Sequence, residues 1–224
     1  MWLPLLIPLL FLCFAAVLWW HRHAQHARQQ FIDAYPLPPG LLLRVRQTYP
    51  ALDDKQLALV EAGLRQFFRL SLAARRQAVA MPSQVVDELW HNFILYTRNY
   101  QQFCKRAFGY YLHHTPAVEM GERRSQRGAI RRAWHLACKE EGIQPGTPSR
   151  LPLLFELDAL LAIPNGFIYT PDCKAPGANA GDSYCGADLG SDTGCASCSG
   201  DGDAAGDGGG DGGSSCGSGC GGGD

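Results

Sequence analysis

The chain has 224 residues with 20 basic and 21 acidic side chains, which gives a formal net charge of −1. Of these, 19 basic but only 12 acidic side chains precede residue 171, so residues 1–170 carry +7 and residues 171–224 carry −8. This distribution of charge is not typical of a protein that binds nucleic acid, so nucleic acid is not expected as a partner. Before residue 171 the cysteines are Cys13, Cys104 and Cys138, and their apolar or helical surroundings exclude a disulfide framework there.

The N-terminal segment is apolar: residues 1–20 read MWLPLLIPLLFLCFAAVLWW and contain no charged side chain. A helix of this length spans about 30 Å, the thickness of the hydrocarbon core of a bilayer. A cleaved signal peptide is the alternative, but no basic residue precedes the apolar run. The pattern predicts a single-pass transmembrane helix in contact with the lipid bilayer. Basic residues after it, such as Arg22 and Arg28, place the domain and tail in the cytoplasm.

Residues 21–40 are expected to form a juxtamembrane linker, and residues 41–170 an all-α domain. In the domain, apolar residues recur at helical spacing and no alternation is long enough for a sheet. The class predicted for the whole chain is a small helical bundle behind a transmembrane helix. Helices are expected over residues 54–80, 84–108 and 118–141, with a shorter one within 151–169. Asp53 or Asp54 is expected to cap the first helix, and Ser83 the second.

The segment 84–108 carries the main candidate site. Its apolar residues cover one broad arc of the helix, and Asp87 and His91 lie one turn apart at the polar edge of that arc. Gly109 allows the chain to turn, and His113 and His114 follow. The sequence therefore suggests a site for a divalent metal such as zinc at Asp87, His91, His113 and His114.

A structural explanation of the same residues stays open. In it, Asp87 orients His91, and His113 and His114 cap carbonyl groups at a helix end. An unbroken helix from His91 to Phe108 would be about 25 Å long, which works against convergence of the histidines. Imidazoles within about 5 Å of one another beside a polar pocket would favour the metal site. A His91 side chain packed into a flat surface would favour the structural role.

The segment MPSQVVDELWHNFILYTRNYQQFC, followed by FGYYLHHTP, resembles the glycine-rich domain-containing protein family. The match falls on an Asp-x-x-Trp-His core and the residues after it: Asp87, Trp90, His91, Tyr100, Cys104, His113 and His114. The resemblance covers roughly residues 45–120 and implies a domain of unknown biochemical function. The plant members are soluble multi-domain proteins, so a membrane anchor departs from their pattern.

Residues 171–224 are rich in glycine, aspartate and cysteine and are expected to form a disordered tail. The cysteine pairs 195–198 and 216–220 have spacings found in four-cysteine zinc sites, but few apolar residues surround them. For the whole chain, the first expectation is a membrane-anchored protein-interaction or scaffold module with an unidentified protein partner. The alternative is a metal-dependent enzyme or sensor built on the Asp87 and His91 site.

Overall fold

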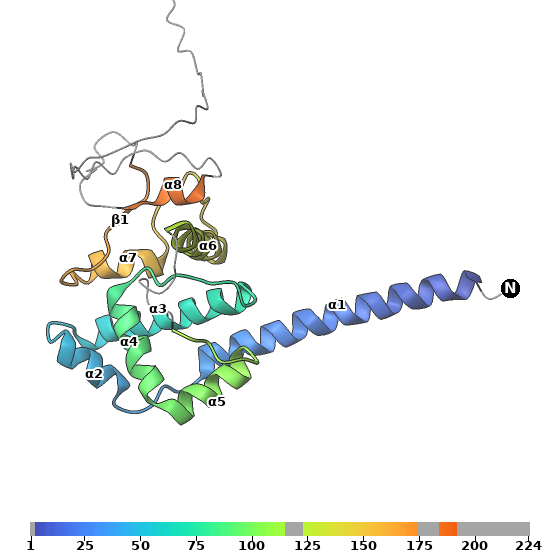
Figure 1. Ribbon diagram of the computed structural model, residues 1–224, viewed down its shortest axis with the longest axis horizontal. Helices are drawn as coiled ribbons and strands as arrows, with labels where there is room; N and C mark the ends of the chain where they lie inside the picture. The colour runs from blue at the N-terminus through green and yellow to red at the C-terminus, as the bar shows by residue number, and fades with distance from the viewer. Residues whose placement is uncertain (1–2, 115–122, 174–183, 192–224) are drawn as a thin grey trace, which may run out of the picture. The chain divides into compact units, whose positions relative to one another are not determined.

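The structure, a computed structural model, describes residues 3–114, 123–173 and 184–191. Eight helices and two short strands occur in these residues (Figure 1): α1 (Leu3–Ala34), α2 (Leu41–Thr48), α3 (Asp54–Ala73), α4 (Gln84–Leu95), α5 (Thr97–Ala107), α6 (Arg123–Glu141), α7 (Leu153–Leu160), β1 (Tyr169–Thr170), β2 (Tyr184–Cys185) and α8 (Gly186–Gly190). The two strands pair in parallel. The expected helical class of the domain is confirmed.

Helix α1 runs without a break from the apolar N-terminal run into the polar residues that follow it. In the part of the chain that the structure describes, no helix is both long and apolar enough to cross a membrane. The predicted transmembrane helix over residues 1–20 is not upheld by this finding. The single-pass topology and the cytoplasmic placement derived from it are corrected with it, whereas contact with the lipid bilayer stays a prediction.

The C-terminal part of α1 packs against α3 and α5, although residues 21–40 had been expected to form a linker. Ile32 is buried, and Arg65 of α3 donates a hydrogen bond to its carbonyl oxygen at 2.6 Å. Arg28 donates to the carbonyl oxygen of Phe108 at 3.2 Å. Ile32 belongs to the hydrophobic core and Phe31 packs against it, so the end of α1 is part of the helical domain.

Helix α3 lies in the middle of the bundle and packs against α1, α2, α4, α6 and α7. It begins as predicted: the Asp53 carboxylate accepts a hydrogen bond from the Gln56 amide at 2.7 Å, and the Gln56 side chain accepts one from the Asp53 amide. This reciprocal capping box satisfies two amides that would otherwise be unpaired at the helix start. Gly63 lets α7 approach closely, since a Cβ at this position would overlap the Leu157 side chain.

The segment 84–108, predicted as one helix, is divided at Tyr96. Tyr96 has φ −81° and ψ 61°, and its amide donates to the Phe93 carbonyl at 3.0 Å, which closes α4 with a tight final turn. Helix α5 then starts in a new direction (Figure 1). Because of this break, the residues that follow α5 are not carried away from His91 along a straight helix axis.

The start of α4 is held by a buried carboxylate from α7. Asp158 is 3% exposed and accepts hydrogen bonds from the Ser83 hydroxyl at 2.7 Å and from the Gln84 amide at 2.7 Å. It also accepts from the amides of Val85 and Phe167, at 3.3 and 2.9 Å. The Ser83 hydroxyl in turn accepts from the Val86 amide, so Ser83 is the N-cap as predicted. This network fixes the first turn of α4, which carries Asp87.

Part of the segment predicted to be a disordered tail is described. Cys173 and Cys185 form a disulfide beside the β1–β2 pair. Helix α8 follows and packs against α6, with Gly186 so close to Trp134 that a side chain there would overlap the indole. The cysteine pairs 195–198 and 216–220 lie outside the described residues.

Candidate metal centre

Asp87 and His91 lie one turn apart on α4, as the helical spacing predicts. Their closest side-chain atoms, Asp87 Oδ2 and His91 Nδ1, are 3.3 Å apart. The same ring nitrogen lies 3.0 Å from the backbone carbonyl oxygen of Asp87. The His91 side chain is 49% exposed, so this ring is accessible from solvent.

His114 reaches this pair from the loop that follows α5. Its Nε2 lies 2.9 Å from Asp87 Oδ1, and its ring centroid lies 4.0 Å from that of His91 and 4.6 Å from that of Trp90. One ligand atom from each of Asp87, His91 and His114 lies within 4.8 Å of the others. The structure thus brings together three of the four residues that the sequence singled out.

His113 is not part of this cluster. Its ring contacts Tyr111, with the ring centroids 4.8 Å apart. In an extended loop neighbouring side chains point in different directions, so only one member of a histidine pair can face Asp87. His113 lines the same cavity at another point.

The loop is tied down by the other residues of the Asp-x-x-Trp-His segment. Trp90 donates its indole N–H to the Tyr100 oxygen at 3.0 Å, and the Tyr100 hydroxyl donates to the Leu112 carbonyl at 2.6 Å. Leu112 is two residues before His114. Burial raises the pKa of the Tyr100 phenol, and of the Cys104 thiol beside it, so both groups stay protonated near neutral pH. Cys104 is thus a buried structural residue, as its position in the helix suggested.

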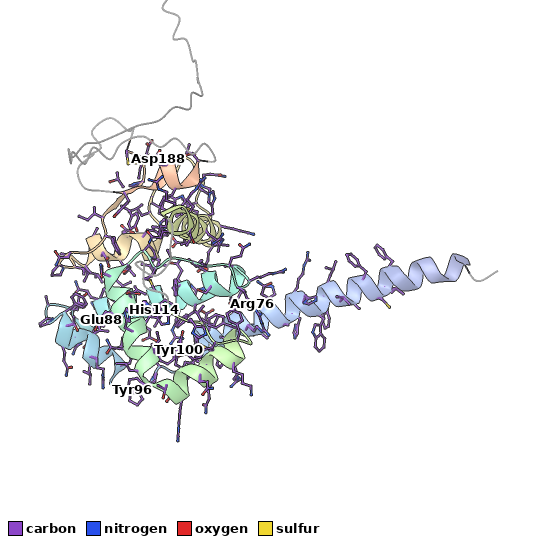
Figure 2. The ribbon with its side chains drawn as sticks, viewed as in Figure 1. Arg76, Glu88, Tyr96, Tyr100, His114 and Asp188 are labelled. Atoms are coloured by element: carbon purple, nitrogen blue, oxygen red, sulfur yellow. A yellow bond between two sulfur atoms is a disulfide. The ribbon has the colours of Figure 1, made fainter. Side chains whose placement is uncertain are left out.

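A cavity of about 780 Å³ opens beside the cluster. Its walls come from α3, the segment 76–81 that follows it, α4, the loop at 110–114, the start of α6 and Phe167. Among its lining residues are Asp87, His91 and His114. Figure 2 shows His114 beside α4 and Arg76 near the C-terminal end of α3.

Sequence reasoning did not identify the other polar residues of this cavity, among them Ser71 and Arg76. Both residues fall within the single helix that the sequence predicts over residues 54–80. The structure ends α3 at Ala73 and gives Arg75 and Arg76 positive φ values of 49° and 69°. No glycine or proline marks this change of direction in the sequence, so its local pattern held no signal for it.

The donor set suits a divalent transition metal. Two imidazoles and one carboxylate bind zinc at roughly 2.0–2.2 Å, which places neighbouring ligand atoms about 3.4 Å apart in a tetrahedral site. Both Asp87–His pairs already have a similar spacing, at 3.3 and 2.9 Å. These two distances involve different oxygens of Asp87, and single donor atoms of the three residues lie up to 4.8 Å apart, so the side chains must approach one another by about 1.4 Å to reach that geometry. The same donor set also suits ferrous iron.

The sequence profile of one family, UCP032817-like, matches residues 27–189. The match covers the helical core, the cluster at Asp87 and the disulfide. No curated protein and no solved structure matches the chain. The resemblance to the glycine-rich domain-containing proteins is corrected by this result, because the Asp-x-x-Trp-His segment on which it rested is one part of a different and longer family match. The chain belongs to the UCP032817-like family.

Proposed function

We propose that this protein is a metal-dependent enzyme or sensor in which Asp87, His91 and His114 bind one zinc or ferrous ion. The observation that carries the proposal is the convergence of three donor atoms within 4.8 Å at the wall of a cavity. Helix spacing alone explains the first two residues. It does not explain why a loop 23 positions after His91 returns to place a third donor against Asp87.

A purely structural network explains the cluster less well. Groups that only hold a fold together are usually packed on all sides, whereas His91 is half exposed and faces the cavity. Two imidazoles with ring centroids 4.0 Å apart would also repel each other if both were protonated. A bound metal requires both rings to be neutral and would replace the contacts that their ring nitrogens make with the Asp87 carboxylate.

Three protein ligands favour a reactive or sensing centre over a structural one. Structural zinc sites are closed by four protein ligands, whereas catalytic sites use three and keep a position for water or substrate. Here the side open to the cavity offers that position. A metal there would act as a Lewis acid or lower the pKa of bound water. The interaction or scaffold module expected from sequence stays a prediction; it requires no such open position.

The test is metal binding by the purified full-length chain. Zinc or cobalt(II) is titrated calorimetrically into the protein and into the variants His91→Ala and His114→Ala, with His113→Ala as the matched control. We expect one site that the first two substitutions weaken by a factor of at least about 100 and the control leaves within about threefold.

Cobalt absorption separates this site from the cysteines of residues 171–224. Thiolate ligands give an intense charge-transfer band in the near ultraviolet, which nitrogen and oxygen ligands lack. The proposal holds if the site lost in His114→Ala has no such band. It is overturned if all binding carries the thiolate band, or if His91→Ala and His113→Ala bind alike.

A further inference from the structure

The polar groups of the cavity that lie outside the metal cluster indicate what it holds. We infer that the cavity binds a small organic anion with a ring-containing body, whose charged group pairs with Arg76 and which also hydrogen-bonds the Ser71 hydroxyl. The inference rests on the proposed function, since it names the ligand of the same site. Three independent features of the lining support it: a cation, a buried unpaired hydroxyl and an aromatic wall.

Arg76 supplies the cation. Arg76 is exposed, its guanidinium carbon lies 5.1 Å from the centroid of the Tyr110 ring, and it takes part in none of the ion pairs among the described residues. Stacking on an aromatic ring holds the planar guanidinium in place while leaving its N–H groups free at the edge. That arrangement suits two parallel hydrogen bonds to a carboxylate or phosphate.

Ser71 supplies a buried hydroxyl that lacks a hydrogen-bond partner. The residue is 3% exposed and lines the cavity, and its Oγ has no partner among the described residues. Buried hydroxyls are nearly always paired, so this one calls for an additional group. A polar atom of a bound ligand satisfies it.

The residues that line the cavity favour a ligand with a ring over one with a flexible chain, and an anionic ligand over a cationic one. The aromatic residues that line the cavity are Phe67, Trp90, Tyr110, Tyr111 and Phe167. Their flat faces suit stacked or edge-to-face contact with a ring, and the volume of about 780 Å³ is that of a small-molecule site. Among the described lining residues, Asp87 is the single carboxylate, and in the proposed site it binds the metal.

The test uses three fluorinated probes and ¹⁹F NMR on the zinc-loaded full-length chain. The probes are 4-fluorobenzoate, 4-fluorophenylphosphonate and the neutral 4-fluorobenzamide, which share a ring and differ in the head group. We expect at least one of the anions to bind at least tenfold more tightly than the amide, and the stronger of the two identifies the head group. The variant Arg76→Gln is expected to weaken that binding by roughly 10- to 100-fold.

The matched control is Arg75→Gln. Arg75 has the same positive φ conformation and the same charge, but it does not line the cavity. Binding kept in Arg75→Gln and lost in Arg76→Gln supports the inference, and Ser71→Ala is expected to weaken binding by a smaller factor. Equal loss in the two arginine variants overturns it, as does equal binding of the amide or no binding of either anion.

Metal content measured in each sample keeps the two ideas apart. A chain that binds zinc at Asp87, His91 and His114 but neither anion refutes the inference and leaves the proposed function standing. A chain without zinc at these residues refutes the proposed function itself.

Discussion

The Tyr100 hydroxyl donates a hydrogen bond of 2.6 Å to the carbonyl of Leu112, which ties the loop bearing His114 to α5. The same oxygen accepts the indole N–H of Trp90, the residue next to His91. One phenol therefore links the two segments that carry the histidines. The hydrogen bond to Trp90 is buried and the one to Leu112 is partly buried, so the link is sensitive to the loss of a single oxygen atom.

Tyr100→Phe is expected to destabilise the fold by about 1–3 kcal/mol, because it leaves a buried indole N–H and a carbonyl unpaired. It is also expected to weaken zinc binding about tenfold, since the loop no longer holds His114 against Asp87. Urea denaturation and zinc titration measure the two effects. Tyr96→Phe is the control: its hydroxyl is exposed and lies 3.4 Å from the Pro39 carbonyl, so the loss should be small. Unchanged zinc affinity in Tyr100→Phe would remove the positioning role.

Asp158→Asn tests the anchor of α4. The carboxylate of Asp158 accepts four hydrogen bonds, whereas an amide would turn an N–H₂ group toward backbone donors. We expect a loss of about 2–4 kcal/mol in the free energy of unfolding. Ser83→Ala removes the cap but keeps the carboxylate, and should cost about 1 kcal/mol. Similar losses in the two variants would show that Asp158 contributes little beyond the cap.

The pKa of Glu141 allows a prediction of how the free energy of unfolding depends on pH. Burial alone would raise the pKa of this carboxyl, but hydrogen bonds from Gln66 and the Leu153 amide, together with Arg150, outweigh burial and lower the pKa below its usual value. A lowered pKa in the folded state means that the stabilisation is present above the unfolded-state pKa, near 4.5, and is lost as the pH falls through the folded-state value.

The unfolding free energy should therefore decrease more steeply below about pH 4.5 in the parent chain than in Glu141→Gln, which cannot titrate there. At pH 7 the variant should be the less stable of the two. Urea denaturation between pH 3 and 7 measures both curves. Parallel curves for the two proteins would show that Glu141 does not contribute to acid sensitivity.

The parts of the fold that local chemistry determines were predictable from sequence, and the parts set by tertiary contacts were not. The cap at Asp53 and the Asp87–His91 pair follow from short-range spacing, which sequence shows directly. The break at Tyr96 has no glycine or proline to mark it. It accompanies tertiary packing, in which the partly buried Tyr96 side chain packs against the hydrophobic core.

That break decided how much of the site could be predicted. With a straight helix the histidines stay apart, and with the bend at Tyr96 His114 reaches Asp87. The end of α3 at Ala73 could not be predicted from the sequence for a similar reason: Arg75 and Arg76 adopt positive φ, which neither residue type favours. Arg76 therefore fell within the helix expected over residues 54–80, with no sign that it lines a cavity.

The disulfide gives the last prediction. Cys173 and Cys185 are 12 residues apart in sequence, and their bond holds β1 against β2 next to α8. A cross-link that closes a loop of this size restricts the unfolded chain and stabilises the folded one by up to about 3 kcal/mol. Cys185→Ser should therefore lower the free energy of unfolding by about this amount under oxidising conditions, with the first loss of structure near Trp134, which α8 covers.

Reduction supplies the control. In excess dithiothreitol the parent chain should fall to the stability of Cys185→Ser, while the variant itself should not change, because it has no bond between these positions to lose. Tryptophan fluorescence during urea denaturation follows both proteins. If the parent chain is equally stable with and without reductant while mass spectrometry shows the bond broken, the disulfide does not stabilise this fold, and the contact of α8 with Trp134 holds without it.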